Sequence, residues 1–322
     1  MPWIVREAVD DINQAVGRRW RGLDPLLPEP NGLPEGCMAP LLAAGENGRP
    51  AGLGVCRHQH VPTESLAQTW NAAAKFVLTL RLREPDARAA TDDLLTQWRG
   101  HLAGLPEAAA EDTAAVVNWP ARDVTGVLAL SRHGLQPMTV IAARPAGRPI
   151  TADRADAAPG LVIRPAGTDD LDAVAEMEMG VIRYDAHFGA AIPRPATEAL
   201  VRADTRAALG RLPAWIWLAE IGRRPVGLTV VEAPHDAAWI AGMTRPGATA
   251  YLQTMFVRPD ERGGGIGAAL VRHVHDQLDA RGIDVTLLHY AQLNPLSAPF
   301  WHRMGYRPLW STWEARPVAA LR

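Results

Sequence analysis

The chain has 322 residues, which exceeds one average domain and predicts two. With 48% hydrophobic and 21% charged residues, its composition is typical of a packed globular protein. A formal net charge of -2 excludes a global positive field, so we expect neither nucleic acid nor a membrane surface as a partner. Arginine supplies almost all the positive charge, and Lys75 is the only lysine.

The N-terminal residues Met1 to Glu7 lack the basic and apolar segments of a signal peptide, and no window of the sequence is long and apolar enough to span a bilayer. We therefore expect a cytoplasmic protein. The only cysteines, Cys37 and Cys56, form neither a disulfide framework nor a metal-binding spacing. We expect both to be buried small hydrophobes, and we expect no metal site.

The two halves of the chain resemble each other. Arg132–Pro137 (RHGLQP) matches Arg303–Pro308 (RMGYRP) at an offset of 303 − 132 = 171. The same offset carries Val116–Trp119 onto Leu287–Tyr290. Such a match predicts a repeated architecture.

An upstream match extends this repeat. The Pro-Asp-x-Arg core beginning at Pro85 corresponds to the one beginning at Pro259, at an offset of 259 − 85 = 174. We interpret the chain as two copies of one α/β unit, in residues 1–150 and 161–322, joined by a linker at 151–160 that is rich in small and charged residues.

Periodicity and turn residues predict the elements of the second copy in chain order. They are a strand at 161–164, a helix from Asp169 or Asp170 to about Tyr184, a helix at 196–209, a hairpin of 215–219 and 226–231, a strand at 250–257, a helix ending at Gly282, a strand at 283–288, a helix at 299–304 and a strand at 308–315. The resulting order is β-α-α-β-β-β-α-β-α-β.

A glycine-rich loop lies between the strand at 250–257 and the following helix. It reads Arg262-Gly263-Gly264-Gly265-Ile266-Gly267. Glycines allow successive N–H groups to point into one concavity, and the helix adds its unpaired amides, so the segment predicts a pyrophosphate site. A dinucleotide-binding loop would follow the first strand, and a triphosphate loop would contain Gly-Lys-Ser/Thr, so neither a dehydrogenase nor a kinase is indicated.

Arg262, Gly265 and Gly267 fill the pattern Arg/Gln-x-x-Gly-x-Gly/Ala, and residues 294–306 read NPLSAPFWHRMGY. In these two ordered motifs the sequence resembles the GNAT superfamily of N-acetyltransferases, over about residues 161–316. The resemblance implies an α/β fold of two GNAT-like domains, each with a central, twisted, mostly antiparallel mixed sheet flanked by helices.

The resemblance further implies that acetyl-CoA or another acyl-CoA is a co-substrate. The strand would offer main-chain hydrogen bonds to the pantetheine, the loop would bind the pyrophosphate, and two downstream side chains would flank the pantetheine. The cofactor-binding residues implied are Met255, Phe256, Val257, Arg262, Gly263, Gly264, Gly265, Ile266, Gly267, Ala268, Asn294 and Phe300.

The first copy departs from the motif. Arg88 aligns with Arg262, but Ala89 to Asp93 stand at the glycine positions, where they remove backbone freedom and add carboxylates. We expect this copy to be degenerate and to bind no CoA, with a structural role beside the second copy.

Catalytic groups are less clearly indicated. Trp301 stands where many relatives have a tyrosine acid, so Tyr290, Ser297 or His302 would protonate the thiolate. The stretch Tyr251 to Thr254 lacks the usual carboxylate base, which leaves Glu232, His289 or a water chain.

The acceptor pocket of the family lies near the first two helices, where carboxylates could hold a cationic amine. Glu176, Glu178, Tyr184, Asp185, His187 and Phe188 populate that region, and Trp215, Trp217, Trp239, Trp310 and Trp313 are candidates for lining or packing. We expect an N-acyltransferase that acts on a small-molecule amine by direct attack in a ternary complex, as a monomer or homodimer. The alternative is a non-catalytic acyl-CoA-binding or scaffold protein, and a protein amine as acceptor stays open.

Overall fold

A computed structural model describes residues 3–30, 32–33, 40–45, 49–150, 158–213 and 215–322. One mixed sheet of eleven strands runs through both halves, in the order β1-β2-β3-β4-β11-β5-β10-β9-β8-β7-β6. The first half contributes β1 (Leu41–Ala44), β2 (Pro50–His60), β3 (Ala74–Leu82), β4 (Thr113–Pro120) and β5 (Gln136–Pro145), with α1 (Trp3–Leu23), α2 (Ala87–Ala103) and α3 (Val127–Arg132).

The second half follows the predicted order of elements, with one added short helix, α6 (Ala238–Ala241). Its strands are β6 (Leu161–Pro165), β7 (Ile216–Ile221), β8 (Arg224–Glu232), β9 (Thr249–Val257), β10 (Val285–Ala291) and β11 (Arg307–Ala315). Its longer helices are α4 (Leu171–Ala186), α5 (Thr197–Leu209), α7 (Ile266–Ala280) and α8 (Ser297–Arg303). β10 therefore begins two residues after the start, and ends three residues after the end, of the strand predicted at 283–288.

The two halves repeat the same order of elements, as the sequence match predicts. The strands and helices from β1 to β5 correspond to those from β7 to β11, with α2 equivalent to α7 and α3 equivalent to α8. In both halves the third and fourth strands of this repeat run parallel, β3 beside β4 and β9 beside β10. A crossover helix, α2 or α7, joins each parallel pair, as parallel strands require.

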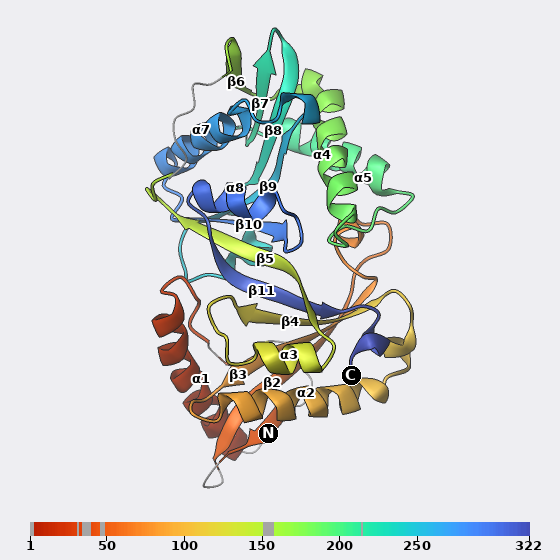
Figure 1. Ribbon diagram of the computed structural model, residues 1–322, viewed down its shortest axis with the longest axis vertical. Coiled ribbons are helices and arrows are strands. Elements are labelled where there is room, and N and C mark those ends of the chain that lie inside the picture. The colour runs from red at the N-terminus through yellow and green to blue at the C-terminus, as the bar shows by residue number, and fades with distance from the viewer. Residues whose placement is uncertain (1–2, 31, 34–39, 46–48, 151–157, 214) are drawn as a thin grey trace.

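The last strand of each half is exchanged with the other half. β11 pairs with β4 from Trp310↔Pro120 to Ala315↔Ala115, and β5 pairs with β10 from Val285↔Pro145 to Ala291↔Thr139. Both strands cross the middle of the molecule (Figure 1). The two predicted sheets are thus joined into one, and most of the predicted linker, 151–157, lies outside the described residues.

Two partly buried arginine–carboxylate pairs hold the exchanged strands. Arg144 on β5 donates to both carboxylate oxygens of Asp279 on α7, each at 2.9 Å. Arg307 on β11 donates to Asp24 at 2.7 and 2.8 Å. Burial disfavours the charge on Asp24, but bonds from Arg307 and from the Leu26 N–H outweigh this and lower its pKa.

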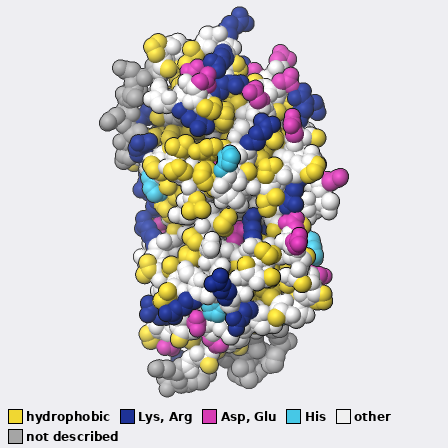
Figure 2. Space-filling model, turned by 45° about the vertical axis from the view of Figure 1, so that its right-hand side comes forward, with side chains coloured by type: hydrophobic (Ala, Val, Ile, Leu, Met, Phe, Trp, Pro, Cys, Tyr) yellow, Lys and Arg dark blue, Asp and Glu magenta, His cyan; other side chains and the backbone are white. Residues whose placement is uncertain are grey.

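Helices cover both faces of the sheet. α2 and α3 pack on one face of the first half, and α7 and α8 continue that layer over the second half. α1 lies on the opposite face with β2 and β10, and α4 covers that face of the second half. On the molecular face in Figure 2, acidic and basic side chains are interspersed, in keeping with the small net charge.

The structure bears on two further expectations. Cys56 is buried, as predicted, and burial raises the pKa of its thiol to about 11, whereas Cys37 lies outside the described residues. Among the described helices, none combines the length and the apolar character needed to cross a membrane.

Candidate active site

The sheet opens between β9 and β10. Their parallel pairing extends only from Val285↔Thr249 to Leu287↔Tyr251, after which the strands diverge. On the other side of β9, Thr254 pairs with Val230 and Leu252 with Val231, so Gln253 is a bulge. Bulges bend a strand and redirect its groups, and β9 beyond Tyr251 has main-chain groups with no strand partner on the β10 side.

A cavity of about 1250 Å³ begins in this opening. A pocket for one drug-sized ligand occupies roughly 300–1,000 Å³, so this cavity has room for two ligands. The predicted residues on its wall are Met255, Phe256, Val257, Arg262, Gly263, Gly265, Ile266, Gly267, Ala268, Asn294, Phe300, Tyr290, Ser297, Glu232 and His289. Gly264 and His302 are not on the wall.

The glycine loop adopts backbone conformations that other residues disfavour. Gly263 and Gly265 have φ of +89° and +78°, and Gly265 is the N-cap of α7. At Gly267 an added Cβ would lie 3.1 Å from Met255 Cε and 3.5 Å from Phe300. The loop thus turns the chain sharply and lets the α7 N-terminus, with its unpaired amides, approach β9 beside the cavity.

Arg262 is held against the wall of the cavity. Its Nε donates to the carbonyl oxygen of Val257 at 3.1 Å, and its guanidinium lies over the rings of Tyr184 and Phe256, with its central carbon 5.5 and 5.9 Å from the ring centroids. A positive charge is therefore positioned beside the amides of the loop, an arrangement suited to an anion.

Tyr290 and Trp301 lie on the α8 side of the opening. Trp301 is buried and packs edge-on against Phe300 and Tyr306, so it fills space in the core. Burial raises the pKa of Tyr290 to about 12, and its hydroxyl makes no hydrogen bond within the described part of the chain. Tyr290 is therefore a protonated group with a free O–H beside the cavity.

The opposite wall carries a linked set of side chains from β8, α6, β9 and β10. The Tyr251 hydroxyl lies 3.0 Å from His289 Nδ1, and Trp239 stacks on the His289 ring with an interplanar angle of 9°. Trp239 Nε1 donates to Glu232 Oε2 at 2.8 Å. Burial raises the pKa of Glu232, whereas burial and the charge of Lys75 lower that of His289 to about 4.

Asp185 is a further candidate site residue. The sequence predicted it in the acceptor region but not as a catalytic group. It lies on the cavity wall, and burial raises its pKa to about 6 even though Asn294 Nδ2 donates to it at 3.4 Å. Of the other predicted acceptor residues, only Tyr184 and Trp239 line the cavity. No sequence signal separated Asp185 from its helical neighbours, because its contact with Asn294 joins residues that are far apart in the sequence.

Glu176 and Glu178 were both candidates for binding the acceptor amine, but neither lines the cavity. Residue type alone therefore could not identify the acceptor-binding carboxylates. Glu176 pairs with Arg258 at 3.1 Å, outside the cavity. Glu178 is buried between α4 and α5, where the Thr205 hydroxyl donates to Glu178 Oε2. Burial raises the pKa of this carboxyl to about 7, although the bond from Thr205 opposes the shift.

Replacing Glu178 by Gln should remove a pH-dependent loss of stability. The folded-state pKa of Glu178 is raised, so the folded protein retains a proton that the unfolded chain releases as pH rises from about 4.5 to about 7. Wild-type stability should therefore fall over this window. Urea unfolding should show Glu178→Gln gaining about 3 kcal/mol relative to wild type between pH 4 and pH 8. Glu176→Gln is the control, and equal pH slopes for wild type and Glu178→Gln would contradict a neutral Glu178.

Residues 213–308 match the family model described as an acetyltransferase (GNAT) domain. The chain contains a GNAT domain. A search of curated proteins finds no match. Among solved structures, a GCN5-related N-acetyltransferase from Sphaerobacter thermophilus aligns over 86% of this chain and 80% of its own, with 15% identity and a TM-score of 0.53. This similarity supports the fold.

Two other solved structures match nearly the whole length of the chain. A GCN5-related N-acetyltransferase from Kribbella flavida covers 98% of both chains at 14% identity, with a TM-score of 0.46. A tandem GNAT protein from the clavulanic acid biosynthesis pathway covers 96% of both chains at 15% identity, with a TM-score of 0.41.

The first half differs from the GNAT domain at the equivalent opening. β3 and β4 also diverge, after Leu78↔Val117, but Leu80, Leu82, Trp98 and Leu130 belong to one buried cluster there. α2 begins two residues after Pro85 (87 − 85 = 2), whereas α7 begins seven after Pro259 (266 − 259 = 7).

The first half therefore has no loop at the position of the glycine motif. Residues 89–93, which align with the glycine positions, lie inside α2. The physical reason is that Ala87 and Ala90 are small enough to pack directly on the sheet, so the helix can begin early without a turn.

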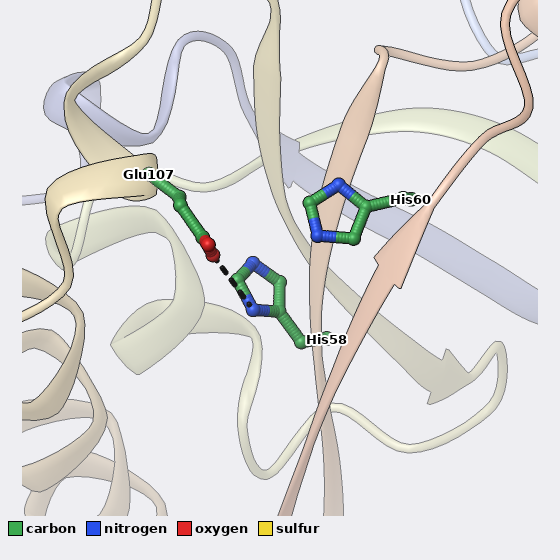
Figure 3. A group of neighbouring side chains, drawn as sticks. All are labelled: His58, His60 and Glu107. Carbon is green, nitrogen blue, oxygen red and sulfur yellow. Dashed lines mark ion pairs between the residues drawn. The ribbon is translucent and has the colours of Figure 1, made fainter.

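His58, His60 and Glu107 form a separate group near the end of β2 (Figure 3). Their ligand atoms lie within 4.8 Å of one another, and His58 Nδ1 is 3.3 Å from Glu107 Oε2. Zinc ligands in a tetrahedral site are about 3.3 Å apart, which follows from bonds of about 2.0 Å. The His58–Glu107 pair has that separation, and all three residues lie outside the cavity of the GNAT domain.

Proposed function

We propose that the protein transfers an acyl group, most simply acetyl, from acyl-CoA to the amine of a small molecule. The single observation that carries this proposal is the shared cavity: the glycine loop, the open edge of β9 and a set of titratable side chains all line it. If the glycine loop served only to let α7 pack closely on the sheet, we would not expect it to line a cavity together with titratable side chains.

CoA would lie along β9 with its pyrophosphate at the α7 N-terminus. Gly263, Gly265 and Arg262 supply a turn, a helix cap and a positive charge, which together favour a diphosphate. The pantetheine would run between the β9 edge and the side chains of Asn294 and Phe300. Its thioester would then lie near the bulge at Gln253, where main-chain groups of β9 are open.

Transfer would proceed by direct attack in a ternary complex. The neutral amine adds to the thioester carbonyl, a C–N bond forms, and main-chain N–H groups of β9 stabilise the oxyanion. The C–S bond then breaks, and the CoA thiolate takes a proton from the Tyr290 hydroxyl or from water. Ser297, also on the wall, is the alternative donor.

The amine must lose a proton during the reaction. Glu232, His289 and Asp185 line the side of the cavity that faces α4 and α6, and the charges of both carboxylates act on the Tyr251 hydroxyl between them. We propose Glu232 or His289 as the group that accepts this proton, directly or through water, with Asp185 holding the cationic amine before attack.

The direct test follows labelled acetyl-CoA with the full chain and a panel of small amines, measuring both free thiol and labelled amide. We expect stoichiometric release of thiol and formation of amide for some amines. CoA binding without transfer to any amine would instead support a non-catalytic acyl-CoA-binding protein, the alternative suggested by the absence of the usual tyrosine at position 301.

A further inference from the structure

The cavity continues beyond the GNAT domain onto the sheet of the first half. From β10 it crosses β5, β11 and β4 to β3 and β2, and each strand contributes side chains to one face. The register aligns Thr139 with Thr312, and Thr312 with Asn118. The exchanged strand β11 therefore carries the cavity wall from one half of the chain to the other.

The first-half end of the cavity carries an excess of positive charge. Its charged lining residues are Arg57, Lys75, Arg316 and Glu314. Glu314 is 8% exposed and pairs with Arg316, which leaves Arg57 and Lys75 without a carboxylate partner at this end of the cavity. The excess is three cations minus one carboxylate, a charge of +2.

Lys75 is placed to bind a ligand. Its ammonium donates to Asn71 Oδ1 at 2.7 Å, so two of its three N–H donors have no hydrogen-bond acceptor within the described residues. Burial lowers the pKa of this ammonium although Glu314 opposes the effect, which means that the site is poorly hydrated. A bound anion would offset that desolvation. Every other cation at this end is an arginine.

The opposite charges lie at the other end of the same cavity. Asp185 and Glu232 line the wall near the opening between β9 and β10, where the amine would react. Adjacent strands are about 4.8 Å apart, so the backbones of β11 and β3 lie about 10 Å and about 19 Å from that of β10. The long side chain of Lys75 shortens this span, because its charge still acts on His289 of β10. Apolar side chains such as Leu66, Trp70 and Met138 line the wall between the charged ends.

We propose that the acceptor is an elongated amine that carries an anionic group at its far end, and that Lys75 and Arg316 bind this anion. The proposal rests on the acyl transfer proposed above and names the substrate class of that site. It also gives the first half a role: it supplies the anion-binding end of the acceptor pocket.

The test compares kcat/KM for acetyl transfer to ω-amino carboxylates, from glycine to 8-aminooctanoate, with that for alkylamines of the same length. In the wild type we expect the longest amino acids to be preferred over their alkylamines at least tenfold. Each variant removes one charge-assisted hydrogen bond to the anion, so Lys75→Met and Arg316→Met should each lower this preference about tenfold or more. Lys75→Arg should retain most of it.

Two controls separate this proposal from the proposed function. Arg99→Met, on the exposed face of α2, should leave the preference unchanged. The CoA-induced rise in Tm of Lys75→Met reports that the variant is folded. Calorimetric binding of 8-aminooctanoate to the CoA-loaded protein gives a readout without catalysis.

Binding that depends on Lys75 without any transfer would uphold the anion site and overturn the acyl transfer. Transfer to alkylamines and amino carboxylates at equal rates, or a preference unaltered in Lys75→Met, would overturn the anion site alone. Failure of 8-aminooctanoate to bind would also overturn it.

Discussion

Replacing Gly265 by Glu is expected to abolish the stabilisation of the protein by CoA. A ligand that binds only the folded state stabilises it by about 2.7 kcal/mol at one hundred times its Kd, so CoA should raise the Tm of the wild type by several degrees. Gly265 has φ of +78° and caps α7 at the cavity wall. A glutamate there would place a carboxylate where the diphosphate binds, and its repulsion would remove the shift.

The matched control is Gly282→Glu. Gly282 has φ of +72°, lies beyond the opposite end of α7, and has nothing within 4 Å of an added Cβ. Both variants should lose about 1–2 kcal/mol of stability to backbone strain. Only Gly265→Glu should lose the response to CoA, and a response as large as that of wild type would mean that the pyrophosphate lies elsewhere.

Tyr290→Phe is expected to lower turnover about tenfold to a hundredfold while CoA binding is retained. The hydroxyl of Tyr290 is protonated at neutral pH, because burial raises its pKa to about 12, and it has no hydrogen-bond acceptor within the described residues. The effect lies at the low end of general-acid catalysis, because CoA thiolate is already a tolerable leaving group. Single-turnover rates of thiol release with saturating acetyl-CoA measure it.

Tyr306→Phe is the control for this variant, because its hydroxyl bonds to His275 Nε2 at 3.2 Å in the core, away from the cavity. Wild-type rates in Tyr290→Phe would assign the proton to Ser297 or water. A loss beyond a thousandfold would show that a dedicated acid is indispensable. Trp301→Tyr should not raise turnover, since Trp301 is packed against Phe300 and Tyr306.

Local sequence patterns predicted most elements of the second half and the two motifs that meet at the cavity. The glycine loop and residues 294–300 carry their signal in a few adjacent residues, so their geometry follows from local backbone preferences. The repeat predicted that both halves share one order of elements. These features depend on contacts close in sequence.

The strand exchange and the first-half end of the cavity could not be predicted in the same way. β5 and β11 both contain runs of buried residues, and periodicity does not specify which neighbour a buried strand selects. Lys75 stood out only as the single lysine, and its place on the wall depends on four strand pairings between β10 and β3. Asp185 likewise owes its raised pKa to burial, which arises only in the folded chain.

Calorimetric titration of the full chain with CoA tests the central claim most directly. In the described part of the chain the glycine loop lies beside the cavity, in the second half, whereas Leu80, Leu82 and Trp98 of the first half belong to a buried cluster. We therefore predict one CoA per chain in the wild type and none in Gly265→Glu. No binding in the wild type, or two CoA molecules per chain, would contradict the assignment of the cofactor to the second half.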